Sequence, residues 1–134
     1  MAEQETAGSC AELEPYALRV EGESMMPEFE DGCIIIVDPG HEVLSGIYAV
    51  IEHAGEHIFR QLILAEGSAY LNPINQRFPP QELTKDYSVK GVVVQSSYRR
   101  RIRHYEYPSP GEVVRHEKSR GQKQRSENRP SPKP

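Results

Sequence analysis

The stretch GESMMP, residues 22–27, carries the side chain that is best placed for covalent chemistry, the hydroxyl of Ser24. Gly22 allows a tight backbone approach two residues earlier, and Pro27 suits the first turn of a helix, where a missing N–H costs nothing. A serine at the start of such a turn exposes its oxygen, and nearby backbone N–H groups can stabilise a developing oxyanion. A hydroxyl is nevertheless a weak nucleophile until a base takes its proton or its own pKa falls. A plain N-cap serine is the alternative interpretation of these residues.

Short strands are expected to position this turn. Period-two alternation predicts a strand at residues 16–20, and the turn after Ser24 ends at the Asp31-Gly32 signal. Apolar and β-branched runs predict a hairpin turn at 53–56 and further strands at 33–37, 45–52, 57–64, 68–75 and 89–95, the last extended by 97–105. Because helical periodicity is nearly absent, we expect a compact, mostly antiparallel β fold with one short helical turn at Ser24.

The chain has room for one small domain. We expect a flexible N-terminal arm at residues 1–14, the folded domain at 15–107, and a disordered, basic, proline-rich tail at 108–134. The formal net charge of −4 hides an asymmetry, because residues 99–134 hold 11 of the 16 Lys and Arg but only 4 of the 20 acids. An acidic body followed by a basic tail is therefore expected.

Several classes of protein are disfavoured by the sequence. No run approaches 18 apolar residues, and the acidic start lacks the basic and apolar parts of a secretory signal, so we expect neither a membrane span nor export. The two cysteines, Cys10 and Cys33, do not make a disulfide framework, and a cytoplasmic location is the default. His41, His53 and His57 lack metal-ligand spacing, so we expect neither a metal nor a cofactor.

The segment VEGESMMPEFEDGCIIIVDP resembles the nucleophile segment of the LexA/UmuD-type serine peptidases. It matches the family pattern Gly-x-Ser-Met-x-Pro, then an acidic-glycine turn and an apolar strand. The segments GIYAVIE, HIFRQLIL, YLNPIN and VKGVVV match in order and spacing, over residues 15–105 or so. The resemblance implies the LexA/signal-peptidase-like fold, usually dimeric, with Ser24 at the nucleophile position and the N–H groups of Ser24 and Met25 at any oxyanion site. Cys33 stands where the family often has aspartate, which we interpret as a packing difference.

The same resemblance puts Arg60 at the position of the family's general-base lysine, within IFRQL. A buried lysine can lose its proton near neutral pH, whereas the neutral fraction of an arginine at pH 7 is of order one in a million. Three interpretations stay open: Arg60 is a fixed cation that supports weak activity, another base such as His57 serves, or the site is silent. His57 lies three residues away on the same strand and is expected to face the opposite side. Lys85 and Lys90 lie away from this strand.

LexA-type proteins cut their own chain at a small-residue bond, and Ala7-Gly8 offers one. It lies only 17 residues before Ser24, whereas the family places its bond about twice as far away, so we interpret Ala7-Gly8 as a coincidence. No helix-turn-helix fits before Tyr16, so the chain resembles UmuD in length. UmuD-like proteins are accessory subunits of an error-prone DNA polymerase, a role that needs the dimeric fold more than catalysis.

We therefore expect a LexA/UmuD-like homodimer of the SOS or DNA-damage response, a self-processing peptidase or polymerase accessory whose catalysis is impaired by Arg60. The alternative is a non-enzymatic module of the same fold that binds a DNA polymerase, a repressor or a recombinase filament. The segment YRRRIRHYEY interleaves Arg with Tyr, as in sites that contact phosphates and stack on bases. We favour instead a solvated edge strand that is blunted by charge. The sequence leaves the bond cut and any inducer open.

Overall fold

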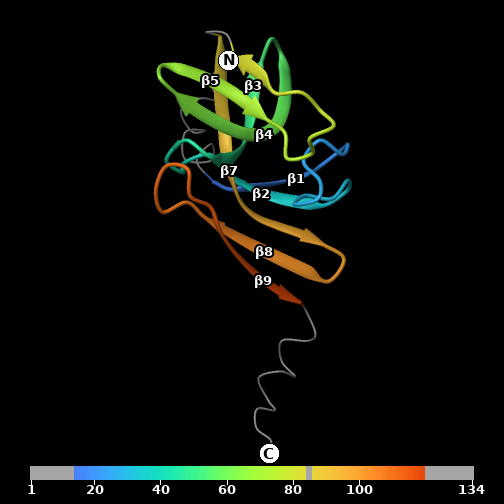
Figure 1. Ribbon diagram of the computed structural model, residues 1–134. Helices are drawn as coiled ribbons and strands as arrows, with labels where there is room; N and C mark the ends of the chain where they lie inside the picture. The colour runs from blue at the N-terminus through green and yellow to red at the C-terminus, as the bar shows by residue number, and fades with distance from the viewer. Residues whose placement is uncertain (1–13, 84–85, 120–134) are drawn as a thin grey trace, which may run out of the picture.

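Nine antiparallel strands make up the part of the chain that the computed structural model describes, residues 14–83 and 86–119 (Figure 1). They are β1 (Tyr16–Arg19), β2 (Ile34–Asp38), β3 (Ile47–His53), β4 (Glu56–Ala65), β5 (Ser68–Asn72), β6 (Gln81–Leu83), β7 (Tyr87–Tyr98), β8 (Arg101–Glu106) and β9 (Val114–Ser119). The predicted mostly antiparallel β fold is confirmed. Within these ranges no helix is long and apolar enough to cross a membrane.

One long strand, β7, connects the two ends of the molecule. Its first half pairs with β3, which is followed outward by β4, β5 and β6. Its second half lies between β2, flanked by β1, and β8, flanked by β9. Figure 1 shows the result: β3, β4 and β5 lie at one end, the β8–β9 hairpin lies at the other, and β1 and β2 lie between them.

A glycine permits the close approach of β2 to β7. A Cβ atom at Gly91 would lie 2.4 Å from Cγ1 of Val37 and 3.2 Å from the Asp38 carbonyl carbon. Side-chain carbons do not approach other atoms that closely, so any other residue at this position would push the strands apart. The register between β2 and β7 shifts nearby, between Ile36 and Val37, as expected where a strand bends.

The hairpin between β3 and β4 sets the position of Arg60. Ala54 and Gly55 form its two-residue turn with φ angles of 55° and 80°, the left-handed pair that tight hairpins require. The predicted turn at 53–56 is therefore confirmed. With the turn fixed, the pairing runs without a break from His53 opposite Glu56 to positions that place Arg60 opposite Ala49.

An aromatic cluster fills the core between the two ends. The fully buried Phe29 ring meets Tyr48 of β3 and Phe59 of β4 edge-on, each at 4.9 Å between ring centroids. Tyr105 of β8 lies 5.3 Å away on a tilted plane. Such pairs contribute about 0.5–1.5 kcal/mol beyond the burial of area. Since Phe29 belongs to the loop between β1 and β2, this loop is packed against both ends of the molecule.

The C-terminal strands correct the expected domain boundary at residue 107. The chain turns at Arg99, whose φ is 58°, so residues 101–106 return beside β7 as β8 and do not extend it. Pairing with β9 on the other side makes β8 an inner strand, not the solvated edge that its charge suggested. Most β9 side chains are exposed, so backbone pairing and charged contacts hold this strand. Residues 120–134 of the expected tail lie outside the described residues.

Candidate active site

The loop between β1 and β2 carries Ser24 and is closed at its base by backbone hydrogen bonds. The Gly32 N–H donates to the Val20 carbonyl at 2.8 Å, and the Gly22 N–H donates to a carboxylate oxygen of Asp31 at 2.9 Å. Gly22 and Gly32 have φ angles of 103° and 94°, a region that strains residues with a side chain. The acidic-glycine turn seen in the sequence therefore fixes the direction in which the chain enters the Ser24 turn.

The turn itself is anchored by two buried side chains. The Phe29 N–H donates to the Met25 carbonyl at 2.9 Å, the spacing of one helical turn, and the Met26 N–H donates to the Glu23 carbonyl at 3.2 Å. Pro27 follows Met26 through a cis peptide bond. The exposed fractions of Met25 and Phe29 are 1% and 0%. The expected helical turn is thus present as hydrogen-bonded turns, with no regular helix.

Asn75 ties this turn to the segment that follows β5. Its backbone N–H donates to the Ser24 carbonyl at 3.0 Å, and its side-chain amide donates to the Glu23 carbonyl at 2.9 Å. The asparagine carbonyl oxygen accepts the N–H of Arg77 at 3.0 Å. Both the nitrogen and the oxygen of the Asn75 side chain are therefore hydrogen-bonded. The backbone carbonyls of Glu23 and Ser24 are fixed by these contacts. No sequence motif points to Asn75.

The structure brings Ser24 and Arg60 together, although 36 residues separate them. The Nη1 atom of Arg60 donates to Oγ of Ser24 at 2.8 Å and to the carbonyl of Phe59 at 2.8 Å. The serine oxygen therefore accepts a hydrogen bond at the place where a general base would take its proton. A guanidinium has donors only, so this contact cannot activate the serine as a neutral amine would.

Arg60 is a half-buried cation that has no counter-ion among the described residues. Burial lowers the pKa of its guanidinium, and no nearby charge contributes to that shift. Across residues 14–83 and 86–119, no carboxylate lies within salt-bridge distance of Arg60. Because the ordinary pKa of arginine lies so far above neutrality, Arg60 stays charged at physiological pH despite its burial.

A cavity of about 400 Å³ opens beside these two residues. Its walls come from residues 18–21 at the end of β1, residues 57–60 of β4, Ile35, Val50 and Ser24. His57 therefore lies at the same cavity as Ser24, which strand alternation did not predict. Its side chain is exposed, and no hydrogen bond joins it to Ser24 in the described part of the chain.

The Ser24 turn also carries two backbone donors. Among the described residues, the N–H groups of Ser24 and Met25 donate to no other protein atom. Such groups at the start of a turn suit a developing or fixed negative charge. Ser24 and Arg60 line the cavity, whereas Met25 does not; among the described residues, no base is hydrogen-bonded to the serine hydroxyl.

The remaining predicted residues lie elsewhere. The Lys90 ammonium pairs with Glu52 at 3.3 Å, on the surface. The Cys33 thiol is 1% exposed, and burial, followed by the Glu30 charge, raises its pKa to about 11, which fits the packing role we expected. Within the described ranges, no cluster of His, Cys, Asp or Glu side chains is arranged to hold a metal ion. Lys85, Cys10 and the Ala7-Gly8 bond lie outside the described residues.

A network of charges under the Ser24 loop was not predicted from the sequence. Glu28 accepts hydrogen bonds from Tyr105 and Arg115, each at 2.9 Å, and its backbone carbonyl accepts Nη1 of Arg103 at 2.7 Å. Arg103 also donates to Glu117 at 3.2 Å. Arg101 pairs with Glu30 in the same way. The basic residues of β8 and β9 therefore neutralise acids of the Ser24 loop. The basic C-terminal part of the chain thus pairs with the acidic body.

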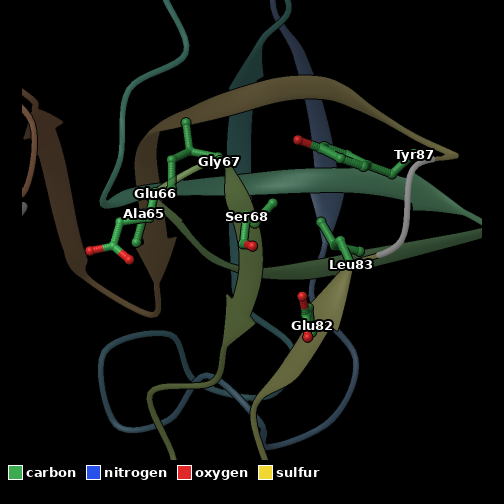
Figure 2. A pocket seen from close by; sticks show the side chains of 9 residues that line it. Ala65, Glu66, Gly67, Ser68, Glu82, Leu83 and Tyr87 are labelled. Carbon is green, nitrogen blue, oxygen red and sulfur yellow. The ribbon is translucent and has the colours of Figure 1, made fainter.

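A larger cavity, of about 530 Å³, lies near the β4–β5 hairpin. Figure 2 shows Tyr87 and Leu83 on one side of it and the Glu66–Gly67 turn on the other. It shares no lining residue with the cavity beside Ser24. Because it contains neither residue of the serine motif, we assign the chemistry to the smaller cavity.

Comparison with known proteins gives a consistent result. Residues 5–94 match the family described as Peptidase S24-like. The chain is 32% identical over 96 residues to repressor protein C2 of Salmonella phage P22, which covers 67% of this chain and 44% of that protein. It is 33% identical over 98 residues to prophage repressor CohE of Escherichia coli K12, which covers 70% of this chain and 43% of that protein. The HTH-type transcriptional regulator for conjugative element SXT of Vibrio cholerae is 32% identical over 88 residues, which covers 60% of this chain and 41% of that protein. The chain thus spans under half the length of these relatives.

Proposed function

The chain belongs to the peptidase S24-like family, and from that premise we propose that it is a regulatory domain of the LexA/UmuD type whose Ser24 site is strongly impaired in peptide hydrolysis. The observation that carries the proposal is the 2.8 Å hydrogen bond from Nη1 of Arg60 to Oγ of Ser24. The position expected for the base holds a group that donates to the serine oxygen and stays protonated at physiological pH.

The relatives supply the biological context of the proposal. They are named as repressors and transcriptional regulators of phages and conjugative elements. We place this domain in the same kind of control, coupled to DNA damage through an SOS-type response. Its contribution is then binding, as a homodimer and toward a repressor or polymerase partner, since binding needs the fold but not a proton acceptor beside Ser24.

Slow self-processing is the competing function, and one observation favours it. A fixed cation beside a hydroxyl lowers its pKa. The N–H groups of Ser24 and Met25, which donate to no protein atom in the described part of the chain, suit an oxyanion. Hydrolysis by this route would accelerate as the pH rises, because the serine must ionise without a base. The rate of self-cleavage and its dependence on pH therefore distinguish the two functions.

Intact mass followed over days, at neutral pH and near pH 10, tests the proposal on the native chain, Ser24→Ala and Arg60→Lys. We expect the native chain to remain as intact as Ser24→Ala, and Arg60→Lys to be clipped in a way that a second Ser24→Ala substitution abolishes. Clipping of the native chain that requires Ser24 contradicts the proposal and identifies the bond through the product masses. Circular dichroism of each variant controls for folding.

A further inference from the structure

The arginine-rich segment around the turn between β7 and β8 contains two kinds of arginine. Those of β8, Arg101 and Arg103, pair with acids of the Ser24 loop, so their charge is balanced inside the domain. Those of the turn, Arg99 and Arg100, are exposed, and neither forms an ion pair with any described residue. The fold therefore uses the charge of the first two and leaves the charge of the turn open to a partner.

The residue types of this turn are not the ones that its geometry favours. The hairpin turns Ala54-Gly55 and Glu66-Gly67 have glycine second, and their first residues have φ angles of 55° and 51°. Arg99 has a φ of 58°, in the same left-handed region, but Arg100 stands where the other two turns have glycine. A side chain in the left-handed region costs free energy that glycine avoids. Since the turn does not require two arginines, their charge is the property that a function would use.

The register of β9 joins more positive charge to the same end of the sheet. β9 ends at Ser119, opposite Arg101, so the chain continues into residues 120–134 beside the turn between β7 and β8 (Figure 1). Lys118 is exposed and forms no ion pair in the described part of the chain. Residues 120–134 hold five Lys and Arg and one acid. We call the turn, Lys118 and residues 120–134 the basic end.

The composition of the basic end indicates the class of its partner. Residues 120–134 contain no aliphatic or aromatic residue, whereas the centre of a protein–protein interface is rich in them. The Tyr98 ring beside the turn is partly buried, and the Arg99 guanidinium lies over it at 5.1 Å from the ring centroid. That face of the ring is therefore not free to stack on a base, as binding of single strands requires. Cations without apolar or stacking contacts suit the phosphates of a nucleic-acid duplex.

We propose that the basic end binds the phosphate backbone of a nucleic-acid duplex without reading its sequence. Arg99 and Arg100 contact phosphates from the sheet, and Lys118 and the C-terminal segment add contacts along the backbone. The inference goes beyond the proposed function, because the described residues of the basic end share no position with the cavity beside Ser24. The contact is one of binding, and no bond is made or broken.

Fluorescence anisotropy of the full-length protein with a labelled DNA duplex of about 20 base pairs, long enough for several phosphate contacts, tests this. We expect the affinity to fall about 100-fold as KCl rises from about 50 to 200 mM, which about four neutralised phosphates imply. Arg99→Gln combined with Arg100→Gln should weaken binding about tenfold at the lower salt concentration and make the salt dependence shallower.

The matched control removes two charges from the other end of the molecule. Arg77, after β5, and Lys90, in the half of β7 that pairs with β3, are both exposed. Arg77→Gln combined with Lys90→Gln should change the affinity by no more than about twofold, because long-range effects of exposed charges are screened by salt. Ser24→Ala should bind the duplex as the native chain does, whichever way the mass experiment ends. Circular dichroism checks the fold of each variant.

Three outcomes overturn the inference. A dissociation constant above about 100 µM at the lower salt concentration is weaker than ordinary non-specific binding and leaves the basic end without this partner. Equal losses of affinity in the two double variants show that net charge, and not the basic end, governs binding. Tighter binding of a single strand of the same length than of the duplex shows that bases are stacked. None of these results bears on the Ser24 site, whereas clipping that requires Ser24 removes the proposed function and leaves this inference standing.

Discussion

Two arginines of this domain, the buried Arg103 and the partly buried Arg60, have opposite surroundings. Burial alone would lower the pKa of Arg103, but nearby charges, foremost Glu28 and Glu117, raise that pKa overall. Burial also lowers the pKa of Arg60, and nothing in the described structure offsets it. Arg103 donates to the backbone carbonyl of Glu28 and to the carboxylate of Glu117, and it forms an ion pair with the Glu28 carboxylate at 3.6 Å. Arg60 donates to a hydroxyl and to a backbone carbonyl.

The difference separates a structural charge from a functional one. Arg103 holds β8 and β9 against the loop that carries Ser24, and its charge is balanced inside the domain. Arg60 adds a charge that the fold does not balance, next to a cavity. A charge that the surrounding protein does not compensate is typical of a site where a ligand or a reaction uses it. Four measurements test this difference.

The largest effect is expected for Arg103→Met. The change removes the hydrogen bonds from Arg103 to the Glu28 carbonyl and to Glu117 together with the ion pair to the Glu28 carboxylate, which keeps Arg115 and Tyr105. The loss of these charge-assisted contacts at a buried position should destabilise by about 3 kcal/mol. Urea denaturation gives the free energy of unfolding. Arg100→Met, at an exposed position, is the matched control and should shift it by less than about 0.5 kcal/mol. A loss of similar size in both variants would mean that the network under the Ser24 loop has no special weight.

Alkaline pH should weaken the fold through Cys33. Its thiol ionises near pH 9 in an unfolded chain but only near 11 in the folded domain, where burial raises the pKa. The unfolded state therefore releases its proton first, and the free energy of unfolding falls between about pH 9 and 11, by at most about 1.4 kcal/mol per pH unit from this group. Buried Tyr48, Tyr105 and Tyr107 also have raised pKa values and add to the fall. Cys33→Ala should show a shallower dependence; an unchanged slope would assign it to the tyrosines.

Tyr105→Phe should cost less, about 1 kcal/mol. The phenol donates to Glu28 at 2.9 Å and lies 3.1 Å from the Ser96 hydroxyl, while its ring packs in the aromatic cluster, which phenylalanine would keep. The control is Tyr70→Phe, because the Tyr70 hydroxyl makes no hydrogen bond in the described structure. Equilibrium denaturation of both variants isolates the contribution of the Tyr105 hydrogen bonds to the free energy of unfolding. If the free energy of unfolding falls equally in both variants, the network around Glu28 does not depend on Tyr105.

The smallest change in stability is expected for Arg60→Gln. Removing an unbalanced, half-buried charge relieves desolvation, while two hydrogen bonds are weakened, so the free energy of unfolding should stay within about 0.5 kcal/mol of the native value. Denaturation in parallel with Arg103→Met makes the comparison direct. A loss above about 2 kcal/mol would make Arg60 a structural residue like Arg103.

The sequence predicted the strands whose side chains enter the core, because β-branched runs and turn residues carry that information locally. The Ala54-Gly55 hairpin is an example, and it determines where Arg60 lies. The proximity of Ser24 to Arg60 was expected from the family resemblance, since no local pattern joins residues 36 positions apart. What the structure adds is the contact itself, 2.8 Å between Nη1 of Arg60 and Oγ of Ser24; its direction follows from the guanidinium, which has donors only.

The strands beyond residue 107 escaped prediction for a physical reason. β9 has few apolar side chains, and its place depends on Arg115 meeting Glu28 and on Glu117 meeting Arg103. Such pairs form between residues as much as 87 positions apart, and charged residues alone are also typical of a disordered tail. The role of Asn75 was missed similarly, because its partners are backbone carbonyls that any residue provides.

The aromatic cluster described above has a spectroscopic consequence. The chain contains three phenylalanines, and two of them, Phe29 and Phe59, touch each other beside the site, whereas Phe78 is 37% exposed. Uniform incorporation of fluorophenylalanine would therefore give a fluorine spectrum of three lines, one of them a built-in solvent reference. Phe59 is the neighbour of Arg60 in the chain and supplies the carbonyl that Arg60 binds. Occupancy of the cavity can thus be followed as the movement of two lines against a third that stays still.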